Sequence, residues 1–299
     1  MYTSFKNSLK SYNISFSVDK PMKMHTSFKI GGPADVFIAP DSVENCCKVI
    51  SLCNEFDINY IVMGKGTNLL VRDDGFRGVV ICISNLISDI ELLDETKIKC
   101  GAGAILSSVC NFALNNSLTG AEFAYGIPGN IGGAVVMNAG AYGGEMKDIV
   151  SSCEYINHKG ELCSISADEL DFSYRHSYFS DKCLCIVSVT LELKKGDESA
   201  IKQTMTELLN RRKEKQPLDL PSAGSTFKRP EGSYASMLID QCGLKGYRVG
   251  DAQVSEKHAG FVVNLGHASC EDVLTLCKNV TDIVYDKTGF KLELEVKVI

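Results

Sequence analysis

The sequence predicts a mixed α+β protein that is built from more than one lobe. Its 299 residues exceed the usual size of a single hydrophobic core. A strand, a helix and a second strand are expected in succession between residues 34 and 63, an order typical of an α/β lobe. Short strands separated by turn residues after residue 150 predict an antiparallel meander. We therefore expect two regions, residues 1–195 and 196–299, with the first divided again near residue 85.

Hydrophobic periodicity and turn residues place the elements of the first region. In chain order we expect strands at 34–40, 59–63, 78–84, 88–94 and 96–103, helices at 42–54 and 104–115, and further strands at 151–157, 161–166 and 184–193. Asp41 or Ser42 can cap the helix at 42–54, because either side chain can accept a hydrogen bond from a free N–H group. A strand, a helix and a strand in this order support the α/β assignment.

A charged helix at 198–216 leads into the second region. Asp197 can cap this helix, and Pro217 ends it because proline cannot continue a helix. After a loop at 221–232 we expect helices at 233–243 and 269–287, strands at 251–255 and 260–266, and a final strand at 291–299. Ser269 and Asp272 predict a capping box. The final strand alternates, with Leu292, Leu294, Val296 and Val298 on one face and Glu293, Glu295 and Lys297 on the other.

Composition argues against several classes of protein. The hydrophobic fraction of 44% and the charged fraction of 23% are typical of a soluble globular chain, and no apolar run is long enough to span a bilayer. The first twenty or so residues lack the continuous apolar core of a secretory signal, so we expect a cytoplasmic protein with no membrane insertion. With a net charge of −6 and no stripe of Lys and Arg, we expect no nucleic-acid partner.

The cysteines and histidines do not form metal-binding or disulfide patterns. The 13 cysteines fall singly within apolar stretches such as 45–53, 79–84 and 183–187, where they read as small buried hydrophobic residues. Their number is odd and no CxxC occurs, so we expect neither a zinc site nor a disulfide framework, and a reducing compartment. The five histidines lack the HxH and HxxxH spacings, so we expect no bound metal.

The stretch Ala121–Met146 is unusually rich in glycine and alanine. Glycine has no Cβ, so the main chain can adopt positive φ and can approach a ligand closely. One interpretation is a pair of helices packed tightly on a sheet, because close backbone packing also selects glycine. The other is a cradle for a large flat cofactor that carries a pyrophosphate. The glycines concerned are Gly126, Gly129, Gly132, Gly133, Gly140, Gly143 and Gly144.

A second glycine turn, residues 64–71 with the sequence GKGTNLLV, follows the strand expected at 59–63. It is not a Walker loop, because Lys65 is followed by Gly66 rather than by Ser or Thr, and it has no GxGxxG pattern. The turn at 101–103 lacks the third glycine of that pattern as well. A strand that ends in Gly-x-Gly-Thr-Asn still presents backbone N–H groups and a hydroxyl to an anion, although a plain tight turn is an equal alternative.

Seven segments of the chain, in this order, resemble the UDP-N-acetylenolpyruvoylglucosamine reductase family, which is also called the UDP-N-acetylmuramate dehydrogenase family. Each segment alone is a weak signal, but together they extend over nearly the whole chain and are highly specific. The segments are HTSFKIGGPADVF (25–37), GKGTNLLV (64–71), GIPGNIGGAVVMNAGAYGGE (126–145), YRHSYF (174–179), PSAGSTFKRP (221–230), SEKHAGFVVN (255–264) and LELEV (292–296).

The resemblance implies an FAD-binding region of two lobes, of the vanillyl-alcohol-oxidase type, followed by a C-terminal α/β lobe that binds the substrate. In this family NADPH reduces FAD, and the enolpyruvyl ether of UDP-N-acetylglucosamine enolpyruvate is then reduced to UDP-N-acetylmuramate for peptidoglycan. We expect non-covalent FAD, because no His or Cys lies in 64–71 or 121–146. The residues implied to bind FAD are Gly64, Lys65, Gly66, Thr67, Asn68, Leu69, Gly126, Ile127, Pro128, Gly129, Ile131, Gly132, Gly133, Asn138, Gly140 and Ala141.

The same resemblance implies three catalytic residues. Arg175 matches the residue at the substrate carboxylate, which a guanidinium can bind through two oxygens. Ser225 matches the residue that gives a proton to the α-carbon after the hydride has arrived. Glu295 matches an acid beside the substrate, and we expect it to carry a proton because an ionised Glu295 would repel the substrate carboxylate. In an arbitrary protein an Arg in a loop, a Ser in a glycine turn and a Glu on an alternating strand would usually be exposed or bonded to backbone. Their coincidence with three family motifs favours the catalytic interpretation.

Lys215 and Arg229 resemble the positions that hold the substrate diphosphate, although Lys215 could equally be a solvated helix end. The family match assigns no role to His258, for which a histidine bonded to backbone is the simpler expectation. The chain lacks the longer Tyr-bearing insertion of one family branch, so it matches the shorter branch. Two alternatives remain open: another non-covalent FAD oxidoreductase of the same fold, or a non-enzymatic protein that binds nucleotide sugars.

Overall fold

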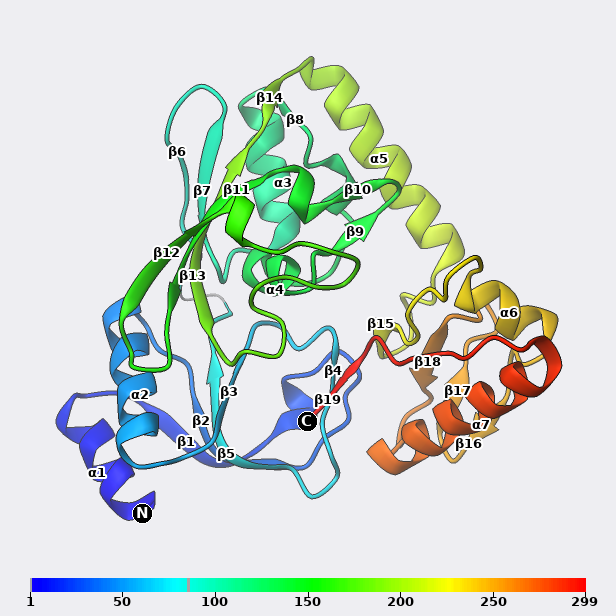
Figure 1. The fold of residues 1–299 in the computed structure, drawn as a ribbon, viewed down its shortest axis with the longest axis horizontal. Helices are drawn as coiled ribbons and strands as arrows, with labels where there is room; N and C mark the ends of the chain where they lie inside the picture. The colour runs from blue at the N-terminus through cyan, green and yellow to red at the C-terminus, as the bar shows by residue number, and fades with distance from the viewer. Residues whose placement is uncertain (1, 85–86) are drawn as a thin grey trace. The chain divides into compact units, whose positions relative to one another are not determined.

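The computed structural model describes residues 2–84 and 87–299, whose elements are drawn in Figure 1. The chain forms two compact units, and both are discontinuous in sequence. The expected division near residue 85 lies outside the described residues. The boundary expected between residues 195 and 196 separates a region that binds FAD from a region that binds the substrate. Because it is defined by these ligands, this boundary stays a prediction. The first unit comprises Met1–Val18, Val36–Lys65 and Gly78–Arg211, and the second unit comprises Asp19–Asp35, Gly66–Arg77 and Arg212–Ile299.

The first unit contains an antiparallel sheet of five strands, in the order β12-β11-β13-β7-β6. Its strands are β6 (Ile90–Leu92), β7 (Lys97–Gly101), β11 (Val150–Ile156), β12 (Leu162–Ser166) and β13 (Cys185–Glu192). The antiparallel meander predicted after residue 150 is therefore confirmed. The central strand β13 is buried along most of its length, which explains why its residues are almost continuously apolar.

The predicted strand, helix and strand before residue 64 are also confirmed. They are β2 (Pro33–Ile38), α2 (Val43–Glu55) and β3 (Tyr60–Met63), in a sheet with the order β1-β2-β5-β3 that is completed by β1 (Phe16–Pro21) and β5 (Phe76–Cys82). The strands β3 and β5 pair in parallel. Of the two residues that could cap α2, Ser42 is the one used, because its hydroxyl accepts a hydrogen bond from Asn45 N at 3.1 Å.

An N-terminal helix, α1 (Tyr2–Ser11), was not among the predicted elements. Phe5 and Leu9 stand four residues apart, which is the spacing of one helix face, and both side chains are fully buried. The Phe5 ring meets the Phe56 ring edge to face, with 6.1 Å between the centroids. The pattern for this helix was present in the sequence, but the sequence did not show which surface would cover it.

The cysteines behave as the sequence predicted, since all 13 are free and most are buried. Cys46 and Cys185 are fully buried, with 3.5 Å between their sulfur atoms. Burial raises the pKa of the Cys100 thiol to about 12, so this thiol stays protonated and unreactive at neutral pH. Cys47 and Cys163 are half-buried, and Cys183 is exposed.

The second unit contains an antiparallel sheet in the order β15-β18-β17-β16, together with two helices. Its elements are β15 (Ser222–Ser225), α6 (Ala235–Gln241), β16 (Arg248–Val249), β17 (Ala252–Val254), β18 (Phe261–Asn264) and α7 (Cys270–Thr288). The buried side chains of this sheet and of the two helices form one hydrophobic core with residues from the segments 19–35 and 66–77, among them Phe28 and Leu70. These two segments therefore belong with the C-terminal residues.

The final strand predicted at 291–299 is wrong for most of its length. Only β19 (Lys297–Val298) is a strand, and it pairs in parallel with β4 (Leu69–Leu70). The residues before β19 bond instead to the loop after β15, since Lys228 N donates to Glu293 O and Glu295 N donates to Thr226 O, both at 2.8 Å. The alternation of buried and exposed side chains nevertheless holds for Leu292 and Val296, which are buried.

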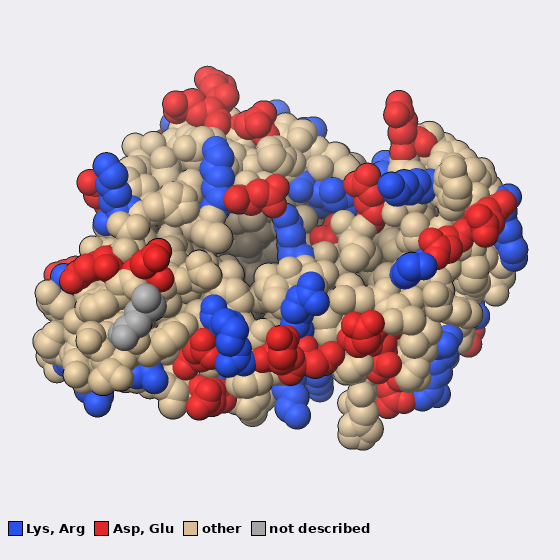
Figure 2. Space-filling model, turned by 60° about the horizontal axis from the view of Figure 1, so that its bottom comes forward, with Lys and Arg blue, Asp and Glu red and all other residues tan. Residues whose placement is uncertain are grey.

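The charged helix predicted at 198–216 is confirmed as α5 (Glu198–Lys215). Asp197 caps it, because its carboxylate accepts a hydrogen bond from Ala200 N at 2.9 Å. Within the part of the chain that the structure describes, no helix is both long enough and apolar enough to cross a membrane. On the face shown in Figure 2, Lys and Arg side chains are interspersed with Asp and Glu side chains.

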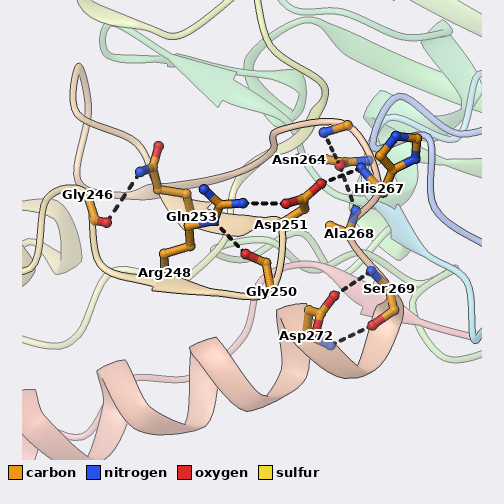
Figure 3. A network of polar contacts seen from close by, with 11 residues as sticks. Gly246, Arg248, Gly250, Asp251, Gln253, Asn264, His267, Ala268, Ser269 and Asp272 are labelled. Atoms are coloured by element: carbon orange, nitrogen blue, oxygen red, sulfur yellow. Dashed lines mark hydrogen bonds and ion pairs between the residues drawn. The ribbon is translucent and has the colours of Figure 1, made fainter.

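The start of α7 is held by several polar side chains (Figure 3). The predicted capping box is confirmed, since Ser269 N donates to Asp272 Oδ2 at 2.9 Å and Asp272 N donates to Ser269 Oγ at 3.0 Å. Asp73, which is distant in sequence, accepts hydrogen bonds from Cys270 N at 2.9 Å and from Glu271 N at 3.2 Å. A carboxylate at this end also interacts favourably with the helix dipole.

We predict that Asp73→Ala lowers the free energy of unfolding by about 1–2 kcal/mol, because two N–H groups of the first turn of α7 lose their acceptor. The midpoint of urea denaturation measures this change. Asp74→Ala is the matched control, because the Asp74 side chain makes no hydrogen bond with any described residue. Equal midpoints for the two variants would show that Asp73 does not stabilise α7.

Candidate active site

Asn130 connects three segments of the first unit. Its side chain is buried, with 3% exposed. Its Oδ1 accepts a hydrogen bond from Lys65 N at 2.8 Å, and its Nδ2 donates to Gly103 O at 2.6 Å. One amide therefore joins the end of β3, the turn at 101–103 and the glycine-rich stretch.

Backbone hydrogen bonds complete this junction. Ile131 N donates to Ala104 O at 2.9 Å and Gly132 N donates to Ala102 O at 3.0 Å, at the start of α4 (Ile131–Val136). A Cβ on Gly132 would lie 2.8 Å from the Ala102 Cβ, closer than real Cβ contacts. For Gly132, close packing therefore explains the glycine, as one of the two interpretations of this stretch expected.

Gly133 is different from its neighbour. It is exposed, it lies within α4, and its φ is not in the left-handed region. No described atom lies within 4 Å of the place where its Cβ would be. Neither strain nor packing within the described chain requires a glycine there, so this position fits a backbone surface that a ligand approaches closely.

The second half of the glycine-rich stretch forms a hairpin, β9 (Gly140–Ala141) and β10 (Gly144–Glu145). Tyr142 and Gly143 turn the chain with φ of 56° and 93°, the conformation of a tight two-residue hairpin loop. A Cβ on Gly144 would lie 2.6 Å from the Phe123 ring, so packing requires this glycine. The stretch therefore mixes glycines required by packing or by the turn with the open position at Gly133.

Asn138 uses its side chain within the protein. It is fully buried and has a φ of 39°. Its Nδ2 donates to Glu145 Oε2 and to Ser173 O, both at 2.9 Å, and its Oδ1 accepts from Lys147 N at 3.0 Å. Both amide hydrogens are thus in use, so what Asn138 can offer to a cofactor is its main chain.

Arg175 lies in a strained turn of the first unit. Its φ of 56° is in the left-handed region, which residues other than glycine seldom adopt. Ser173 and His176 close the turn with two backbone hydrogen bonds of 3.1 and 3.2 Å. The Arg175 guanidinium lies 5.0 Å from the centre of the Tyr174 ring. Such strain costs about 1–3 kcal/mol and is typical of functional sites.

In the second unit, Ser225 and Glu295 lie on adjacent backbone segments. Ser225 ends β15 after Gly224, whose φ is 77°, and its strand pairing with β18 is irregular between residues 222 and 225. Glu295 N donates to the carbonyl of the next residue, Thr226, at 2.8 Å. Ser225 and Glu295 are both half-buried, although the other two polar residues on that face, Glu293 and Lys297, are exposed.

Thr226 was not among the predicted site residues, yet it holds the Ser225 segment in place. It is 2% exposed, its N–H donates to Gly260 O at 2.8 Å, and its Oγ1 accepts from Val262 N at 2.9 Å. Asn130 was missed in the first unit for a similar reason. Both residues lie within the quoted motifs, but only the structure shows which partners their side chains bond.

The part of the second glycine turn that belongs to the second unit adjoins Glu295. Asn68 Nδ2 donates to Glu295 O at 3.2 Å, and Lys297 N donates to Asn68 O at 3.0 Å. Gly66 has a φ of 61°, so this turn does require its glycine. The structure therefore brings together Asn68, Glu295 and Ser225, although the family resemblance implies FAD as the ligand of Asn68 and the substrate as the ligand of the other two.

Lys215 and Arg229 are both exposed in the second unit, where a diphosphate could reach them. The Arg229 guanidinium lies 4.5 Å from the centre of the Tyr234 ring. His258 Nδ1 accepts a hydrogen bond from Gly260 N at 3.2 Å, as expected for a histidine bonded to backbone. Burial, and then the charges of Lys245 and Lys215, lower the pKa of His258, so its ring is neutral at pH 7.

Comparison with known proteins identifies the family. Residues 216–299 match the sequence model of the "UDP-N-acetylenolpyruvoylglucosamine reductase, C-terminal domain". Residues 34–166 match that of the "FAD binding domain". A solved chitooligosaccharide oxidase has a TM-score of 0.50 at 12% identity, over 97% of this chain and 60% of the oxidase, a likeness that concerns the fold alone.

Relatives with higher identity bear the same family name. UDP-N-acetylenolpyruvoylglucosamine reductase of Agathobacter rectalis is 51% identical, over 94% of this chain and 93% of the relative. That of Clostridioides difficile is 45% identical, over 100% and 97%. The crystal structure of the Thermus caldophilus reductase aligns with a TM-score of 0.81 and 35% identity, over 95% of this chain and 98% of the other. The chain therefore belongs to the UDP-N-acetylenolpyruvoylglucosamine reductase family, with its FAD-binding fold of mixed α and β structure.

Proposed function

We propose that Arg175, Ser225 and Glu295 carry out the reaction of this family in the present chain. As a member, the chain is an FAD-dependent oxidoreductase that reduces UDP-N-acetylglucosamine enolpyruvate in peptidoglycan synthesis, and NADPH is the hydride donor of the family. The observation that carries the assignment is the hydrogen bond from Glu295 N to Thr226 O, which keeps the Ser225 and Glu295 segments adjacent.

Each of the three residues has a separate role in the proposal. Reduction adds a hydride to the β-carbon of the enol ether and a proton to the α-carbon, so negative charge develops on the α-carbon and its carboxylate before the proton arrives. The Arg175 guanidinium binds that carboxylate. Ser225 Oγ–H gives the proton. Glu295, in its protonated form, donates a hydrogen bond beside the carboxylate and so stabilises the developing negative charge.

The proposed FAD site uses the two glycine segments. Residues 64–69 hold the pyrophosphate, and the stretch from Gly126 to Ala141 lies along the other side of the cofactor. Bound FAD would supply the chemistry of hydride transfer. The open position at Gly133 supports this assignment, as do the positive φ values of Gly66 and Gly129, which are 61° and 131°.

The remaining assignments are also proposals. Lys215 and Arg229 hold the substrate diphosphate, which their exposure and charge support. Residues 1–195 form the FAD-binding region, which also contributes Arg175, and residues 196–299 form the substrate-binding domain. The free cysteines support a reducing, cytoplasmic setting, and the mixture of charges seen in Figure 2 supports the absence of a nucleic-acid partner.

We predict that Gly133→Val folds normally but is purified without the yellow colour of flavin, because its side chain meets no described atom and would occupy the space proposed for FAD. Flavin absorbance per chain and the thermal midpoint are measured together. The matched variant Gly132→Val should lower the midpoint as well, because its Cβ would lie 2.8 Å from the Ala102 Cβ. Full flavin content in Gly133→Val would contradict the cradle at this position.

The FAD should leave the protein on acid denaturation, because neither glycine segment contains the His or Cys that a covalent link would need. Precipitation with trichloroacetic acid followed by absorbance of the supernatant tests this. Colour that stays in the pellet would mean a covalent link and would favour the alternative of another flavin oxidase.

Ser225→Ala should separate the two halves of the reaction, since a proton donor to carbon acts only when the sugar is reduced. We predict that NADPH bleaches the variant at nearly the wild-type rate, while reoxidation by UDP-N-acetylglucosamine enolpyruvate slows by about a hundredfold or more. Ser225→Cys should recover part of the rate, because a thiol can also donate. Stopped-flow absorbance measures both steps. Normal reoxidation of Ser225→Ala would make Ser225 a turn residue only, and binding without any turnover in the wild type would favour a nucleotide-sugar sensor.

A further inference from the structure

The segment 173–180, which begins with the turn of Arg175, is tied to the glycine-rich stretch at three points. Asn138 Nδ2 donates to Ser173 O at 2.9 Å, and the hydroxyls of Ser177 and Ser180 donate to Val136 O at 2.9 and 3.1 Å. All three side chains are buried, with 0%, 0% and 7% exposed. The position of the Arg175 backbone therefore depends on the same stretch that contains Gly133.

Glu145 is the acidic residue of this arrangement. Its Oε2 accepts from Asn138 Nδ2 at 2.9 Å and from Lys147 Nζ at 3.0 Å. Its backbone N donates to Asp148 Oδ2 at 2.8 Å, and its own side chain accepts from the Asp148 N–H to complete a capping box. The Glu145 side chain is 29% exposed. The groups of Asn138, Lys147 and Asp148 that bond its carboxylate hold it in one orientation.

The Asn138 amide links Glu145 to the turn of Arg175, since its Nδ2 donates both to Glu145 Oε2 and to Ser173 O, each at 2.9 Å. The hydrogen bond from Lys147 lowers the pKa of the Glu145 carboxyl most, and the hydrogen bond from Asn138 and the positive charge of Arg175 lower it further, against the effect of burial. The carboxylate is therefore ionised at neutral pH and attracts the guanidinium. A long arginine side chain loses up to about 2 kcal/mol of rotamer entropy when it is held still, so a fixed carboxylate nearby can restrict it before the substrate arrives.

We propose that Glu145, held by Asn138, is a positioning residue that orients the Arg175 guanidinium toward the substrate carboxylate. The inference rests on the proposed role of Arg175. Glu145 touches neither substrate nor cofactor in this proposal and acts only through Arg175. Its negative charge also competes with the substrate carboxylate for the guanidinium, so its removal should slow the reaction without weakening binding of the sugar.

Glu145→Gln tests this, because glutamine keeps an oxygen acceptor for Asn138 and removes the charge. Glu154→Gln is the matched control. Glu154 belongs to the same unit, accepts from Lys99 Nζ at 2.7 Å and from Ser188 Oγ at 2.5 Å, and its pKa is likewise lowered, first by Lys99. Three quantities are measured on each holoenzyme: flavin absorbance per chain, calorimetric Kd of the oxidised enzyme for UDP-N-acetylglucosamine enolpyruvate, and the rate of reoxidation by that sugar.

For Glu145→Gln we expect full flavin content and an unchanged or lower Kd. Reoxidation should slow by about tenfold to a hundredfold, because the Arg175 guanidinium is no longer held in the orientation that the reaction needs. Glu154→Gln should match the wild type in all three. Asn138→Gly, which keeps the left-handed conformation and removes the amide, should show the same slow reoxidation with full flavin content.

Equal reoxidation rates for Glu145→Gln and Glu154→Gln would overturn the inference. So would a rise in Kd or a loss of flavin in proportion to the loss of rate, since that would mean a structural role alone. If NADPH bleaches the wild-type enzyme but the sugar does not reoxidise it, the proposed function itself is contradicted. The wild type is therefore assayed before the variants are compared.

Discussion

The buried amide of Asn130 is the interaction on which the proposed cofactor site of the first unit depends. A buried amide must have its hydrogen bonds satisfied, and Asn130 satisfies them with the backbone of two other segments, at Lys65 and Gly103. Those two bonds fix where α4 begins within the glycine-rich stretch. The close contact of Gly132 with Ala102 then follows, and it leaves the backbone at Gly133 open.

A second asparagine, just after the end of α4, positions another part of the unit. Asn138 adopts a left-handed conformation, which asparagine tolerates better than most residues, and its amide bonds the turn that presents Arg175. The two asparagines thus flank α4, which carries the open position at Gly133. The residue expected to bind the substrate carboxylate is positioned from one of them, so the geometry of the two sites is linked within a single unit.

The second unit positions its proposed catalytic residues in a different way, through backbone. Thr226 joins the Ser225 segment to β18 and accepts a hydrogen bond from Glu295 N. Asn68, from the second glycine turn, bonds the Glu295 carbonyl. Regular strand structure is therefore lost between residues 291 and 296, because the backbone groups that would form a ladder bond these loops instead.

The sequence alone determined the local features: the capping residues Asp197 and Ser269, the antiparallel meander, the buried cysteines, and a family resemblance that the comparisons confirm. Such features depend on neighbours in the chain, so pattern and spacing predict them. Only the tertiary structure decided which glycines serve packing and that the Asn138 amide bonds both Glu145 and the turn of Arg175. It also decided that the segments 19–35 and 66–77 pack with the C-terminal residues. These depend on contacts between residues far apart in sequence, and a single sequence does not specify which distant groups will meet to satisfy a buried amide or to fill the space beside a glycine.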